Sequence, residues 1–235
     1  MDDFFKKVTS SRFYSFGDKL GDIMIASVWW VLCSLPIVTF IPSTIALYYT
    51  CNKSKSTELS MTKLFFKSFR SNFKQGFIIN IIYIIYSIIP ASSIFFGYFG
   101  IGDVKLPDGY FPFSFITLIP IIFTLPFVIA LIARFDNDIK TTFKNAFTLS
   151  ALNLGSTLII WIIMILSLAL MIVFPPSLLL VPMLACKLII PRCEKIFGIA
   201  NKVEESRNNP DINDENSMEN SESEDYDYNE DEDED

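Results

Sequence analysis

The sequence predicts an all-α integral membrane protein with about five transmembrane helices and a disordered acidic tail. Hydrophobic residues make up 51% of the 235 residues, the mean hydropathy is +0.40, and the apolar residues come in long runs. A soluble domain of this length could not cover so much apolar surface. The runs show no alternation of apolar and polar residues, and a backbone in lipid must satisfy its own hydrogen bonds, so helices are predicted rather than strands.

The charges fall into two blocks, which define the predicted domains. Residues 203–235 contain sixteen of the 26 acidic residues and one base, so this segment has a charge of −15 although the whole chain has only −7. Residues 1–202 therefore form a helical membrane domain with a charge of +8. The acidic segment has almost no aliphatic residues to offset the entropy of ordering, so a disordered cytoplasmic tail is predicted.

Five apolar runs are candidates for the roughly 20-residue helices that cross a bilayer. The runs are Ile23–Tyr49, Phe77–Phe99, Phe113–Ala133, Ser156–Phe174 and the shorter Ser177–Ile190. No small-residue cleavage site follows the first run, which is therefore interpreted as a retained span. Because Pro36 and Pro42 interrupt this run, a re-entrant or hairpin pair of helices is the alternative to a single crossing.

The orientation follows from the basic residues of the short connections, which favour the cytoplasmic side. Six bases lie between the first and second runs, within residues 53–74. The third connection has Arg134, Lys140 and Lys144. Arg192, Lys195 and Lys202 follow the last run. Both basic connections and the tail are predicted to be cytoplasmic. Five crossings then place the N-terminus outside, whereas a re-entrant first segment places it inside.

Two segments indicate an internal repeat. The sequence LPIVTFIPSTIAL at Leu35–Leu47 aligns with IPIIFTLPFVIAL at Ile119–Leu131, with two prolines six positions apart and a final Ile-Ala-Leu in each. An offset of two spans predicts parallel repeats, with a final span after them. The prolines are expected to kink the helices and free backbone carbonyls at membrane depth, which either shapes helix packing or lines a substrate path.

The segment Met61–Lys74 predicts an amphipathic helix in the headgroup region on the cytoplasmic side. At about 100° per residue, Met61, Phe65, Phe69 and Phe73 share one face. The opposite face has the four candidate lipid- or partner-facing residues, which are Lys63, Lys67, Arg70 and Lys74. The predicted helix would lie flat, with its rings in the acyl boundary and its cations against anionic lipid headgroups. Ile139, Phe143 and Phe147 predict a second helix of this kind.

The sequence provides no candidate catalytic, cofactor-binding or metal-binding residues, so an enzyme is not predicted. His is absent, the four cysteines form no CxxC pair, and no phosphate-binding or hydrolase motif occurs. Acids and bases are nearly absent from the apolar runs, and the exceptions are Lys187 and the neutral Asn80. Lys187 is close enough to the cytoplasmic end to extend to the interface. Nucleic acid is not a predicted partner, because the bases adjoin apolar runs and interfacial aromatic residues.

Two stretches of the chain resemble the YesL-like family of bacterial membrane proteins. They are FGDKLGDIMIASVWWVLCSLPIVTFIPSTIALYYT at Phe16–Thr50 and ARFDNDIKTTFKNAFTLSALNLGSTLI at Ala133–Ile159. The resemblance covers about residues 4–198 and excludes the tail. After PIVT the family usually has Gly-Ala, whereas this chain has Phe40, Ile41 and Pro42, which leaves the local turn open.

The resemblance implies a multi-span protein of unknown biochemical function in the bacterial plasma membrane. Genes of this family commonly neighbour carbohydrate-uptake ABC systems, which implies an accessory role in sugar uptake and a sugar ABC permease as a partner. The first functional hypothesis is therefore a non-enzymatic accessory or scaffold protein. The alternative is a small-solute transporter or channel with its path at the proline-kinked spans.

Overall fold

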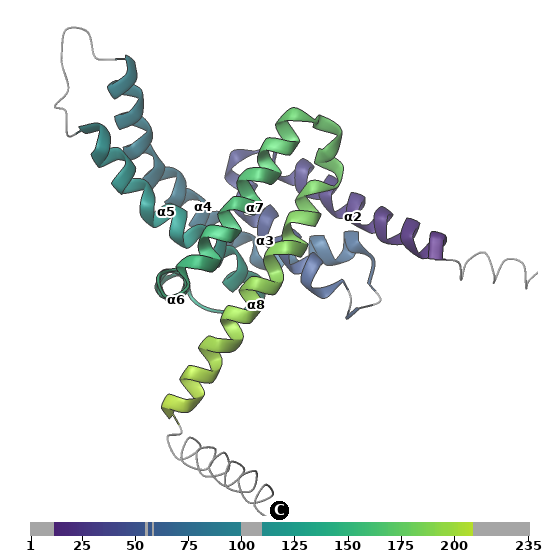
Figure 1. The fold of residues 1–235 in the computed structure, drawn as a ribbon. Coiled ribbons are helices and arrows are strands. Elements are labelled where there is room, and N and C mark those ends of the chain that lie inside the picture. Colours follow the sequence, from purple (N-terminus) through teal and green to yellow (C-terminus); the bar gives the residue numbers. More distant parts are fainter. Residues whose placement is uncertain (1–11, 55, 58, 100–109, 209–235) are drawn as a thin grey trace, which may run out of the picture. The chain divides into compact units, whose positions relative to one another are not determined.

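The computed structural model describes residues 12–54, 56–57, 59–99 and 110–208. The chain divides into two compact units, Met1–Cys193 and Glu194–Asp235. Within the described ranges the secondary structure is helical and contains no strand, which confirms the all-α prediction (Figure 1). The elements are α2 (Arg12–Ser34), η1 (Ile37–Thr39), α3 (Phe40–Lys53), α4 (Met61–Phe99), α5 (Tyr110–Arg134), α6 (Ile139–Leu152), α7 (Leu154–Val173), η2 (Pro175–Leu179) and α8 (Val181–Asn208).

Three of the described helices are long and apolar enough to cross a membrane. They contain the segments Met61–Phe96, Phe115–Arg134 and Leu154–Val173. They correspond to the second, third and fourth predicted runs and agree with a multi-span membrane protein. Leu20–Ser34 is a shorter apolar helix, and the last predicted run is divided between the end of η2 and the beginning of α8.

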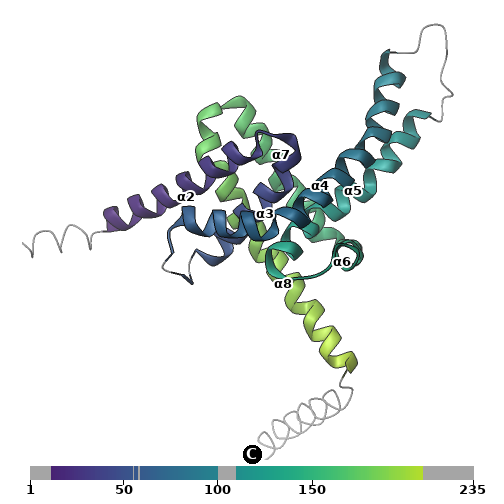
Figure 2. The same ribbon diagram turned by 180° about the vertical axis from the view of Figure 1, so that it is seen from behind.

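The first predicted run is not one helix, because the chain breaks between α2 and α3. Pro36 is extended, with φ −74° and ψ 123°, and a proline also disfavours helical geometry at the residue before it. The Thr39 hydroxyl lies close enough to donate to the carbonyls of Cys33 (2.6 Å) and Pro36 (2.9 Å) at the break. The two helices then pack against each other, as in the hairpin alternative (Figure 2).

Asn80 of α4 joins this break to the long helix beside it. Its side-chain amide donates to the Ile37 carbonyl at 2.9 Å, and its carbonyl oxygen accepts the Ile41 N–H at 3.4 Å. Asn80 is only 4% exposed. A buried backbone group without a partner is costly, so the polar residue in the middle of an apolar run serves to satisfy the irregular backbone opposite it.

Among the elements from α2 to α7, α3 packs most extensively against α4 in the described part of the chain. Gly76 permits this contact, because a Cβ at that position would lie 3.0 Å from Ile45 Cδ1 and 3.2 Å from the Cα of Pro42. Pro42 lies in the first turn of α3, where a missing N–H leaves no helical bond unmade. The buried Ile45, Ala46 and Leu47 continue this interface along α3.

The second proline pair behaves differently, because α5 is continuous through Pro120 and Pro126. A proline inside a helix leaves the carbonyl four residues earlier without its donor. For Pro126 this is the carbonyl of Ile122, which accepts a hydrogen bond from the indole N–H of Trp161 in α7. The freed carbonyl therefore fixes a neighbouring helix. The Ile129–Leu131 triplet is buried, like its counterpart in α3.

α8 begins beside α2 and extends beyond the predicted membrane domain. The buried Ser27 hydroxyl accepts the Met183 N–H at 3.4 Å, and Met183 itself is fully buried. The helix is continuous through Pro191 to Asn208. Residues 203–208 of the predicted tail are helical, and residues 209–235 lie outside the described residues.

Replacement of Asn80 by Leu is expected to destabilise the protein. The change would leave the Ile37 carbonyl and the Ile41 N–H unpaired, at roughly 1–3 kcal/mol for each group. Unfolding in detergent micelles with increasing sodium dodecyl sulfate measures the loss. Asn72→Leu is the matched control, because Asn72 bonds only to Ser68 in its own helix. Equal losses in the two variants would contradict this role of Asn80.

Gly76→Leu is expected to force α3 away from α4 and to lower stability by about 1–3 kcal/mol, as overpacking usually does. The same change at Gly155 in α7 adds a side chain where no atom lies within 4 Å. This control should keep or raise the thermal midpoint, since glycine is the poorer helix former. A Gly76 variant as stable as the Gly155 variant would show that the close approach is not required.

Candidate functional site

Four cations form an exposed row along the first part of α4, and we call Lys63, Lys67, Arg70 and Lys74 the basic row. All four side chains are exposed. Their spacing of four, three and four residues places them on one side of a helix. Leu64, Phe65 and Ser68 lie on another side and are buried. The segment therefore has a basic face and a buried face. Of the residues predicted for the apolar face, Phe65 is buried, whereas Phe73 is exposed.

The aromatic residues of this segment pack mainly against protein. Phe65 has no exposed surface, and Phe73 is 37% exposed. The Phe66 ring contacts the Trp29 ring of α2 edge to face at 4.8 Å, and the Trp29 N–H donates to the Thr62 hydroxyl at 3.0 Å. The prediction placed the rings of Phe65, Phe69 and Phe73 in the acyl boundary. Neighbouring helices, which a helical wheel does not include, bury part of the apolar face instead.

The basic row belongs to the same helix as the second span. The prediction separated an interfacial helix from a span that begins at Phe77, but α4 has no break between Met61 and Phe99. Its 39 residues extend over roughly 58 Å, about twice the thickness of the hydrocarbon core. The sequence has no helix-breaking proline between these two parts, since Pro90 lies further on. The basic row is thus attached rigidly to a membrane helix.

α6 is the second amphipathic helix, and Asp138 caps its start. One carboxylate oxygen accepts the Thr141 hydroxyl and the other accepts the Thr141 N–H. These bonds favour the ionised form and lower the pKa of Asp138 below its usual value. The Phe143 ring packs on the Tyr83 ring at 5.6 Å, whereas Phe147 is 55% exposed. The predicted stripe is therefore only partly on the surface.

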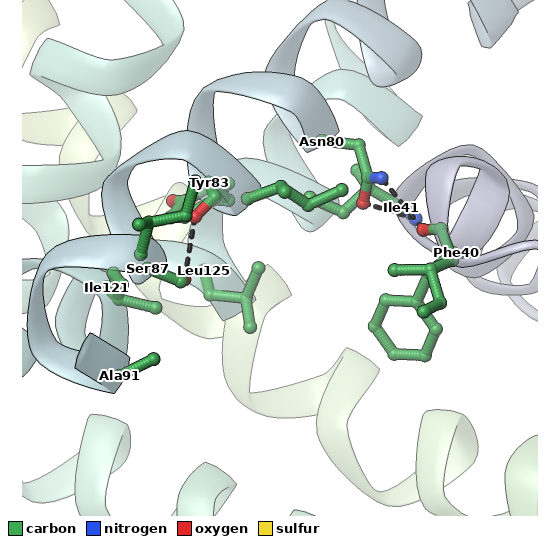
Figure 3. A pocket seen from close by; sticks show the side chains of 11 residues that line it. Phe40, Ile41, Asn80, Tyr83, Ser87, Ala91, Ile121 and Leu125 are labelled. Carbon is green, nitrogen blue, oxygen red and sulfur yellow. Dashed lines mark hydrogen bonds between the residues drawn. The ribbon is translucent and has the colours of Figure 1, made fainter. Parts of the chain in front are cut away.

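An apolar pocket of about 390 Å³ lies between α4, α5 and the α2–α3 break (Figure 3). It is open on one side, and eight of its eleven lining side chains are apolar. The three others already have partners within the protein. Asn80 bonds to the backbone of the break, and the Tyr83 hydroxyl lies 2.7 Å from that of Thr124. The Ser87 hydroxyl donates to the Tyr83 carbonyl.

Of the four prolines predicted to line a path, Pro36 and Pro120 are exposed, whereas the second proline of each pair is closely packed. Pro42 and Pro126 are both buried, and Pro42 contacts the α4 backbone at Gly76. The carbonyl that Pro126 frees is bonded to Trp161. These features agree with the packing interpretation of the prolines.

Within the described ranges, no three His, Cys, Asp or Glu side chains are arranged so that they could hold a metal ion. The four cysteines form no disulfide, and Cys51, Cys186 and Cys193 are buried. Cys186 lies near both of the other two buried thiols. The Lys187 side chain is exposed. The buried polar side chains at the α2–α3 break, Asn80 and Ser43, form hydrogen bonds with backbone groups.

The model of a family described as "Protein of unknown function, DUF624" matches residues 23–94 of the chain. The match extends over η1 and α3 and includes parts of α2 and α4, so it contains both the break and Asn80. It agrees with a resemblance to uncharacterised proteins and does not include the YesL-like name. No curated protein and no solved structure matches the chain.

Asp138→Ala is expected to weaken the first turn of α6, because no side chain then accepts the Thr141 N–H. The lowered pKa adds a pH dependence. The stabilisation by the carboxylate is complete above its pKa in the unfolded chain and is lost as the pH falls through the lower pKa of the folded chain. Hydrogen exchange of the Thr141 amide at neutral and acidic pH measures the effect. Asp138→Asn should keep the cap but lose the pH dependence, and Asp136→Asn should resemble the wild type.

Proposed function

We propose that this chain is a non-enzymatic accessory or scaffold protein of the bacterial plasma membrane, which binds acidic partners through the basic row. The observation that carries the proposal is the continuity of α4, which fixes four exposed cations to a helix of spanning length. A docking surface on a rigid helix loses little conformational entropy when it binds. Cationic groups near a membrane also attract anionic headgroups, by about 1 kcal/mol for each residue.

In the proposed topology the basic row and α6 face the cytoplasm. Lys140 and Lys144 of α6 are exposed like the basic row, and basic connections favour the cytoplasmic side. The packing of α2 on α3 supports a re-entrant pair rather than one crossing. α8 would provide the return to the cytoplasm that Arg192, Lys195 and Lys202 within this helix require. In this topology the five apolar runs and the repeat remain features of the sequence, but the runs would not form five equivalent membrane-crossing helices.

The partner that the YesL-like resemblance implies is a sugar ABC permease, and a docking site for an acidic cytoplasmic surface is compatible with it. A small-solute transporter or channel is the alternative. Such a protein needs polar groups that face a path. The buried prolines and the internally bonded pocket residues favour the scaffold.

Charge reversal of two residues of the basic row, Lys67→Glu with Arg70→Glu, is expected to abolish co-purification of a partner from chemically crosslinked native membranes. Reversal at Lys140 and Lys144 is the matched control, because it makes the same change of charge on α6. The retained partner, identified by mass spectrometry, should have an acidic cytoplasmic surface. Equal recovery with both variants would contradict the proposal. Solute flux through liposomes that contain only this protein would support the transporter instead.

A further inference from the structure

We infer that the apolar pocket beside Asn80 is a binding site for one acyl chain of an anionic phospholipid, whose headgroup lies at Arg70 and Lys74. The inference depends on the membrane insertion of the proposed function but not on the scaffold role. It rests on the chemistry of the pocket wall, on its length along α4 and on the position of the cations.

The chemistry of the pocket favours hydrocarbon over a polar solute. Asn80, Tyr83 and Ser87 are the lining residues with polar side chains, and each is bonded within the protein. A polar ligand would have to give up its hydration without gaining new partners, which is costly. In Figure 3, Phe40, Ile121 and Leu125 lie around the space beside α4. Burial of methylene groups against such side chains is favourable only for an apolar ligand.

The pocket is continuous with the surface that a bilayer would cover. Ile37 and Ile88 line it and are 76% and 59% exposed, so its open side adjoins the outer surface. Along α4 it extends from Asn80 to Ala91, which is about 16 Å at 1.5 Å per residue. One leaflet of the hydrocarbon core is about 15 Å thick, half of the roughly 30 Å of the whole core. The length of the pocket therefore fits one acyl chain.

The charge of the neighbouring surface favours an anionic headgroup. Arg70 precedes Ile88 by about 27 Å, which is five helical turns, so Arg70 is in line with the open edge of the pocket and not with Asn80 at its near end. Lys74 is one turn closer to the pocket and precedes Asn80 by about 9 Å. Both cations are exposed. A lipid with its chain in the pocket would thus place its phosphate near these two cations.

Native mass spectrometry of the full chain tests this inference. The protein would be purified from bilayers of phosphatidylglycerol and phosphatidylcholine in equal amounts and washed with detergent. The wild type should retain one phospholipid per chain, mainly phosphatidylglycerol. Ala91→Phe places a ring at the end of the pocket farthest from Asn80. It should reduce lipid retention about tenfold, because fewer methylene groups of the acyl chain are buried. Ala169→Phe is the matched control, because Ala169 is exposed on α7, outside the pocket, and should retain the lipid.

Two further variants separate the chain from the headgroup. Ile121→Trp fills the pocket from α5 and should reproduce the loss. Arg70→Gln with Lys74→Gln should lower the preference for phosphatidylglycerol about fivefold for each charge while phosphatidylcholine is still bound. Circular dichroism and a single elution peak would show that the variants are folded.

Three outcomes would overturn the inference: a folded wild type without lipid, equal retention by the Ala91 and Ala169 variants, or equal loss from both. Release of the chain from membranes by alkaline carbonate would instead contradict membrane insertion. Equal recovery of the protein partner with the basic-row and α6 variants would contradict only the scaffold role.

Discussion

The hydrogen bonds of Asn80 are the interaction on which the arrangement of the first unit depends. In lipid, an interrupted helix is tolerated only where other groups satisfy its free backbone. The break after Pro36 creates such free groups, and the Asn80 side chain bonds to Ile37 and Ile41 on either side of η1. Because α3 is held against α4 in this way, the close approach at Gly76 becomes possible. One carboxamide thus connects the break, the α3–α4 interface and the wall of the apolar pocket.

Similar proline patterns have different structural results in this protein. In the first pair, Pro36 follows the end of α2 and Pro42 lies in the first turn of α3, whereas Pro120 and Pro126 lie inside α5. At each pair, a backbone group at the irregular position receives a partner from another helix, Asn80 in one case and Trp161 in the other. The prolines here serve as attachment points between helices. This use of the prolines agrees with a scaffold better than with a path for solutes.

The length of α4 links the membrane helices to the surface that would bind partners. A flexible connection would leave the basic row free to reorient, but a continuous helix holds it in a fixed direction relative to the span. The same helix carries the pocket wall, so an anionic lipid at Arg70 and Lys74 would neutralise part of the surface proposed for an acidic partner. The lipid composition of the membrane and the binding of a partner would then be coupled through one helix.

The sequence by itself determined the helical class, three helices of spanning length and the exposure of the basic row, because hydrophobic runs and residue spacing are local properties. It also singled out Asn80 as a polar exception in an apolar run, but not its partners. Only the tertiary structure decided that the first run is a broken pair, that α4 does not end before its span, and that Phe65 is buried in protein. These features depend on contacts between segments distant in sequence. A helical wheel shows which residues share a face, whereas packing decides whether lipid or another helix covers it.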